Sequence, residues 1–67
     1  MLQGYELWLT DRQGRRAFRP AAAHAPADVM REARALLEAD PTLREIAIEV
    51  GGEELMILQN LTATDGE

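Results

Sequence analysis

The chain has 67 residues, which allows one small domain that buries only about 60% of its unfolded surface. It has no cysteine and one histidine, His24, so disulfides and thiolate metal sites are excluded, and we expect no metal and no cofactor. The net charge of −5 argues against nucleic acid as a partner, and no apolar run approaches the roughly 20 residues of a membrane span.

Small domains without disulfides or metals often gain stability by association, so we expect a homo-oligomer or a complex with another protein. The seven basic residues are all arginine, and lysine and serine are absent, which suggests a GC-rich bacterial source. The first residues show neither a basic nor an apolar leader segment, and together with the absence of cysteine this favours a soluble, cytoplasmic protein.

Residues 5–10 alternate between polar and apolar side chains, as expected of a half-buried strand, and residues 15–19 return as a second strand. Between them, residues 11–14 place Asp first and Gly last, which is typical of a type I turn. The sequence therefore predicts a β-hairpin at the start of the chain.

The register of this hairpin depends on the length of its loop. A four-residue loop pairs Leu7 with Phe18 and Trp8 with Ala17, which gathers the large apolar groups on one face. A three-residue loop would instead place Trp8 beside Phe18. Both registers are compatible with the sequence, and we take the four-residue loop for the predicted core.

The connector over residues 20–25 leads into a predicted helix at about residues 26–39. Pro26 suits the first helical turn, and Asp28 places a carboxylate at the positive end of the helix dipole. Pro41 ends the helix, because the residue before a proline avoids the helical region. One apolar stripe runs along the helix at three- and four-residue spacing, formed by Val29, Met30, Ala33, Leu36 and Leu37.

A second hairpin is predicted around Gly51-Gly52, because two apolar runs flank a pair of residues that accept positive φ angles. A two-residue loop with continuous pairing sets Ile48 opposite Leu55 on one face. On the other face it sets Ala47 opposite Met56.

We therefore predict an α+β fold of β-β-α-β-β order, in which one helix packs on one face of a four-stranded sheet made of two hairpins. Strand order is open between a mixed sheet and a meander of two adjacent hairpins. Residues 1–60 form the single predicted domain, and residues 61–67 a frayed tail. Besides the helix stripe, the predicted core contains Leu7, Leu9, Phe18, Ile46, Ile48, Leu55 and Ile57.

The second face of the sheet carries the main functional hypothesis. Under these registers the side chains that project away from the helix are those of Trp8, Leu43, Ala47, Met56 and Leu58. A solvated face should be polar, whereas an apolar centre with a charged rim is typical of a protein–protein interface. We therefore expect a non-enzymatic interaction or self-associating module. In the competing interpretation, either the predicted register is wrong, or the C-terminal tail folds back and covers these residues.

An alternative function rests on the arginines of the first hairpin, because arginine beside an aromatic residue on a sheet can bind phosphates and stack bases. The predicted basic patch comprises Arg12, Arg15, Arg16 and Arg19.

Catalysis has little support in the sequence, so we expect no enzyme. His24 and Asp28 could form an acid–base or metal pair, but an exposed histidine near a helix start is the simpler interpretation. Glu49, Glu53 and Glu54 could bind a divalent cation, although charge at an exposed hairpin end also promotes solubility.

Overall fold

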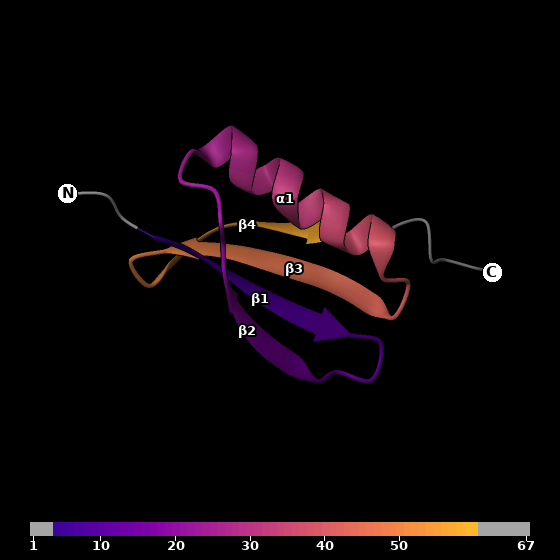
Figure 1. Ribbon diagram of the computed structural model, residues 1–67. Helices are drawn as coiled ribbons and strands as arrows, with labels where there is room; N and C mark the ends of the chain where they lie inside the picture. The colour runs from indigo at the N-terminus through magenta and orange to yellow at the C-terminus, as the bar shows by residue number, and fades with distance from the viewer. Residues whose placement is uncertain (1–3, 61–67) are drawn as a thin grey trace.

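The computed structural model describes residues 4–60 and shows an α+β fold with one helix and one four-stranded antiparallel sheet (Figure 1). The elements in chain order are β1 (Tyr5–Asp11), β2 (Arg16–Pro20), α1 (Pro26–Ala39), β3 (Leu43–Val50) and β4 (Glu53–Gln59). This confirms the predicted fold class, the β-β-α-β-β order and the bounds of the helix.

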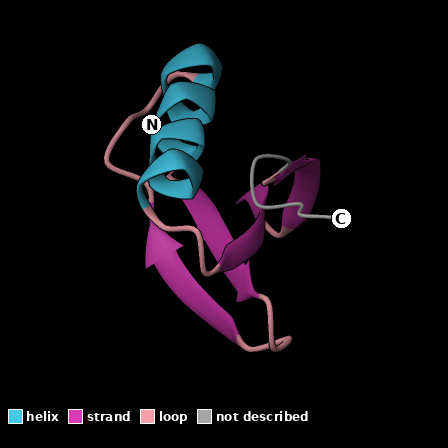
Figure 2. Cartoon of the chain, turned by 90° about the vertical axis from the view of Figure 1, so that its right-hand side faces the viewer, coloured by secondary structure: helices cyan, strands magenta, loops and turns pink. Residues whose placement is uncertain are grey.

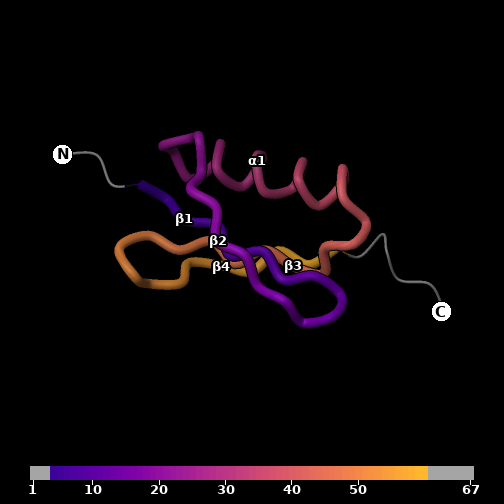
Figure 3. Tube along the Cα trace, turned by 60° about the horizontal axis from the view of Figure 1, so that its bottom comes forward, coloured from indigo at the N-terminus to yellow at the C-terminus, as the bar shows by residue number. Residues whose placement is uncertain are grey.

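The strand order is β2-β1-β3-β4, and every neighbouring pair is antiparallel. The two hairpins lie side by side and are joined through β1 and β3. They form neither a mixed sheet with a neighbouring parallel pair nor a sequential meander. Since β2 and β3 run in the same direction on either side of β1, α1 connects two parallel strands across a third. The two hairpin turns consequently point to opposite ends of the sheet (Figures 1 and 3).

Helix α1 begins and ends where its sequence dictates. Pro26 occupies the first turn, where a missing N–H costs nothing, and Asp28 adds a carboxylate near the helix N-terminus. Asp40 is extended, as a residue before proline should be, and its N–H donates to the carbonyl of Leu36 at 3.1 Å.

The core lies between α1 and one face of the sheet (Figure 2). No residue of β2 contributes to its buried part, and all five residues of that strand are exposed at the sheet edge farthest from the helix (Figure 1). The buried apolar cluster consists of Leu7, Val29, Ala33, Leu37, Leu43, Ile46 and Ile48.

The first hairpin has the shorter of the two loops considered, so the four-residue loop is wrong. The Asp11 N–H donates to the carbonyl of Arg15 at 2.9 Å, and Gly14 adopts φ +86°, which closes a three-residue loop with glycine in the left-handed position. Trp8 therefore pairs with Phe18. Phe18 leaves the predicted core and is 51% exposed.

The second hairpin turns at Gly51-Gly52, whose φ angles are +61° and +86°, and this confirms the two-residue turn. Beyond the pair Glu49–Glu54, however, β4 contains one extra residue, and Ile48 pairs with Met56. The structure has a β-bulge here, and the prediction of continuous pairing is wrong.

A shift of one residue exchanges the two faces of a strand, so the bulge reverses the predicted orientation of β4. Met56 and Leu58 pack against the core beneath α1. Leu55 and Ile57, which the sequence placed in the core, are 49% and 43% exposed.

Asn60 fastens the end of β4 to the helix. Its buried Nδ2 donates to the carbonyl of Leu37 at 3.1 Å and to that of Leu43 at 3.0 Å, and its backbone N–H donates to Arg44 at 2.9 Å. The carbonyl of Leu37 lies in the last turn of α1, where it has no partner within the helix. The predicted frayed tail, residues 61–67, lies outside the described residues.

Candidate protein-binding face

One row of directly paired apolar residues crosses all four strands on the face opposite the helix. The row, here called the apolar row, is Phe18–Trp8–Ala47–Ile57, in the order β2, β1, β3, β4. Phe18 and Ile57 are among the most exposed large apolar residues described, and Trp8 is partly exposed. Within residues 4–60, no helix or strand covers this face (Figures 1 and 2).

The structure places only part of the predicted interface on this face. Trp8 and Ala47 lie in the apolar row, whereas Leu43 is buried in the core at 8% exposure. Met56 and Leu58 pack on the helix side. The prediction is therefore wrong for three of its five residues, Leu43, Met56 and Leu58. The bulges in β3–β4 and in β1–β3 account for the difference, because each changes which residues share a face.

Sequence reasoning missed Phe18 and Ile57 as members of this face. The three-residue loop that pairs Phe18 with Trp8 was one of the two registers considered, so this position could have been found from Gly14 as a left-handed loop residue. No comparable feature in the sequence indicates the bulge that exposes Ile57.

Trp8 is the centre of a stacked cluster on the face. The rings of Trp8 and Phe18 have centroids 5.2 Å apart and are tilted by 57°, which is a favourable aromatic geometry. The guanidinium carbon of Arg16 lies 5.0 Å from the centroid of the Trp8 ring, within the range of a cation–π contact. Because the three side chains already contact one another, a molecule that bound here would restrict few further rotamers.

The apolar row has a charged rim on both sides. The cross-strand register places Arg16, Thr10, Glu45 and Gln59 in the row on one side, and Pro20, Glu6, Glu49 and Glu54 in the row on the other. The paired residues of the rim therefore carry four carboxylates and one guanidinium, and Arg44, the exposed extra residue of the β1–β3 bulge, adds a second guanidinium next to Glu45 in the chain.

Both free edges of the sheet are unsuited to pairing with another strand. Edge strand β2 ends in Pro20 and carries Arg16 and Arg19, while edge strand β4 begins with Glu53-Glu54 and contains the bulge. Proline, charged residues and bulges are the usual means by which sheet edges resist pairing. The accessible part of the sheet is therefore its second face, opposite the helix, and neither of its edges.

The four arginines of the predicted basic patch occupy different settings. Arg12 lies in the turn and donates from Nε to the carbonyl of Pro41 at 2.8 Å. Arg16 stacks on Trp8. Arg19 pairs with Leu7, and because the side chain of Leu7 is in the core, Arg19 lies on the helix side of the sheet. Arg15 is an exposed turn residue.

A shallow hollow of about 350 Å³ lies where the β1–β2 turn meets the α1–β3 loop. Several of its polar groups form hydrogen bonds within these loops. The carboxylate of Asp11 accepts from the N–H groups of Gln13 and Arg15 at 2.9 Å each. Nearby, the hydroxyl of Thr42, and then its N–H, donate to Asp40 and lower the pKa of that carboxyl. These contacts hold the two loops against each other.

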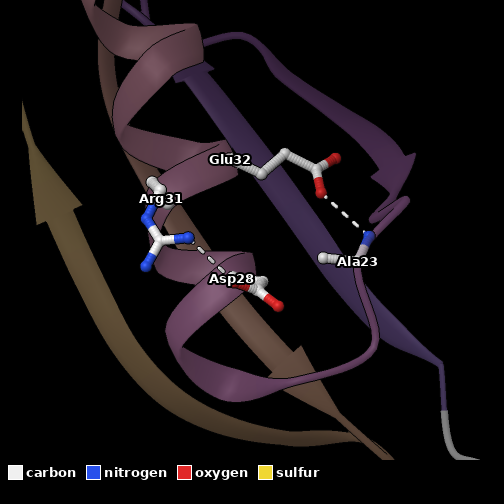
Figure 4. Close-up of polar contacts among 4 residues, drawn as sticks. All are labelled: Ala23, Asp28, Arg31 and Glu32. Atoms are coloured by element: carbon white, nitrogen blue, oxygen red, sulfur yellow. Dashed lines mark hydrogen bonds and ion pairs between the residues drawn. The ribbon is translucent and has the colours of Figure 1, made fainter.

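The connector before α1 is held by the helix itself. The carboxylate of Glu32 accepts from the N–H of Ala22 at 3.0 Å and of Ala23 at 3.0 Å, and the second contact is drawn in Figure 4. Asp28 forms an ion pair with Arg31 at 2.9 Å on the exposed surface, so its carboxylate already has a partner (Figure 4).

His24 lies exposed in this connector. Among residues 4–60, no group of three or more histidine, cysteine or acidic side chains is arranged to hold a metal ion. No helix in the described part of the chain is long and apolar enough to cross a membrane.

Comparison with known proteins gave no match to a protein family, to a curated protein or to a solved structure.

Proposed function

We propose that this protein is a non-enzymatic interaction module that binds a protein partner through the second face of its sheet. The observation that supports this is the apolar row, in which Phe18, a half-exposed side chain, lies beside Trp8, and Ile57, also half-exposed, follows across Ala47. Tryptophan and other large aromatic side chains are enriched in the energetic centres of interfaces. The charged rows on either side provide the polar rim that such interfaces have.

Photo-cross-linking in the cells that produce the protein tests this proposal. Phe18 is replaced by p-benzoylphenylalanine, which keeps an aromatic ring at a position that is 51% exposed. The matched control carries the same group at Glu38, an exposed position on α1, away from the second face.

The proposal predicts a defined adduct from position 18 that is absent from position 38. An adduct with another copy of the chain would indicate self-association, and an adduct with a different protein would indicate a heteromeric complex. If irradiation gives no adduct at position 18, or the same adducts from both positions, the second face is not a binding surface.

Binding of nucleic acid is the second candidate, because Arg16, Trp8 and Phe18 form an exposed cation–aromatic stack on a sheet. Such stacks can receive unpaired bases. The carboxylates of the rim oppose it, since they would lie beside the phosphates of a bound strand. Titration with single-stranded oligonucleotides at low salt decides the matter: binding that weakens in Arg16→Gln and at higher salt would support this function.

A further inference from the structure

We infer that the partner of the second face is a basic, amphipathic segment of another protein, and not a second copy of this chain. This inference rests on the proposed function and adds the chemistry of the partner. It is argued from the charges around the apolar row.

The charge of the rim is the first argument. Glu6, Glu49 and Glu54 lie on one side of the apolar row, and Glu45 lies on the other, where Arg16 is the only positive group among the paired residues. The guanidinium of Arg16 is already stacked on Trp8. A partner that covers the row therefore brings its own rim close to an excess of carboxylates, and lysine or arginine at those positions would be favoured.

A second copy packed face to face meets a charge conflict in either aligned orientation. With the two-fold axis parallel to the strands, β1 faces β3 of the other copy, and Glu6 lies opposite Glu49. With the axis perpendicular to the strands, each strand faces itself in reverse, and Glu45 lies opposite Glu49. The two-fold symmetry makes each like-charge contact occur twice, and juxtaposed like charges disfavour association.

The shape of the surface suits an amphipathic helix. Neighbouring strands lie about 4.8 Å apart, so the apolar row is about 14 Å long, which corresponds to roughly ten residues of helix. A helix with apolar residues at three- and four-residue spacing presents a stripe of this kind, and its flanks would lie over the two charged rows.

Titration with designed peptides tests the inference, with Trp8, the only tryptophan, as the fluorescent reporter. The first probe is a peptide of about 18 residues with leucines at helical spacing and lysine elsewhere, long enough to form a helix on binding. The second has glutamate in place of every lysine, and the third has the composition of the first in shuffled order. The protein variants are Glu49→Lys on the rim and Glu38→Lys on the outer surface of α1, which make the same charge change at different places.

The basic amphipathic peptide should bind the wild type, and the acidic and shuffled peptides should bind at least about tenfold more weakly. Glu49→Lys should weaken binding of the basic peptide about fivefold or more, and Glu38→Lys less than about twofold. Raising the salt from about 0.05 to about 0.5 M should also weaken it. Circular dichroism confirms that each variant is folded, and Glu45→Lys serves as a second rim variant.

Equal binding of the basic and acidic peptides, or equal losses in Glu49→Lys and Glu38→Lys, would overturn the inference. So would a wild-type dimer whose interface buries Trp8, or oligonucleotide binding at the same face. A dimer of this kind would leave the proposed function standing, because the face would still bind a protein. The proposed function itself fails if the cross-linker at position 18 gives no adduct, or gives the same adducts as the cross-linker at position 38.

Discussion

Replacing Asn60 by aspartate should destabilise the fold far more than its conservative appearance suggests. The side-chain amide nitrogen donates two hydrogen bonds, to Leu37 and Leu43, from a buried position. In Asn60→Asp the nitrogen becomes an oxygen of similar size, so the packing is kept and both donors are lost. A carboxylate would then face two carbonyl oxygens at the negative end of the α1 dipole.

The expected loss is about 3–5 kcal/mol at neutral pH. About 2 kcal/mol comes from two hydrogen bonds, and the remainder from two carbonyls left without their donor and from the unfavourable charge at the helix terminus. A chain of this length has a total stability of about 3–10 kcal/mol, so the variant should be mostly unfolded or close to it.

The pH dependence identifies the mechanism. In the folded state, the surroundings raise the pKa of the new carboxyl above its unfolded value of about 3.9, because they disfavour its charged form. The folded state therefore binds the proton more tightly, and the variant should regain stability, relative to the wild type, as the pH falls from 7 towards about 4. Above the raised pKa the full loss should be present.

Urea unfolding at a fixed protein concentration, followed by circular dichroism at several pH values, measures this effect. The control is Gln59→Glu, which makes the same amide-to-carboxylate change at the neighbouring exposed position and should cost less than about 1 kcal/mol, since the new carboxylate lies opposite Glu45. Equal losses in the two variants, or a loss in Asn60→Asp that does not change with pH, would refute the role given to Asn60.

Three further predictions test other parts of the structure. Ile48→Ala should cost about 2–5 kcal/mol in urea unfolding because Ile48 is 2% exposed, whereas Leu55→Ala should cost well under half of that; similar losses would indicate the continuous register without the bulge. Thr42→Val should raise the pKa of Asp40 towards its usual value in an NMR titration, because the hydroxyl of Thr42 is the main cause of the lowered pKa. The stability that this carboxylate contributes is present above its unfolded pKa and is lost as the pH falls through its folded pKa. Gly14→Ala should cost about 1 kcal/mol at its φ of +86°, and a neutral result would argue against the three-residue loop.

The fold was predictable because each element is specified by short-range features. The helix has Pro26 at its start, Pro41 after its end and one apolar stripe between, and the structure follows these bounds. The turn at Gly51-Gly52 was predictable because few dipeptides accept two positive φ angles. Strand order was not, since it depends on how the two hairpins dock and not on either hairpin alone.

The candidate site was less predictable, because facial assignment depends on register along the whole strand. Leu55, Met56, Ile57 and Leu58 are consecutive apolar residues, so alternation of hydrophobicity does not indicate which two face the helix. Trp8 and Ala47 lay on the expected face because the core residues beside them in β1 and β3 are unambiguous.

The β-bulge raises the question of what fixes the register of β4 against β3. Because this strand is apolar on both faces, burial alone discriminates weakly between the observed register and one slipped by a single residue. The hydrogen bonds of Asn60 then favour the observed register, since a slip of one residue would move its amide away from the carbonyls of Leu37 and Leu43. Deleting Leu55 would remove the bulge and leave Asn60 in the same register, with both of its side-chain hydrogen bonds. The chain would then present the same residues on each face with continuous pairing, so the bulge is not required for the composition of the apolar row.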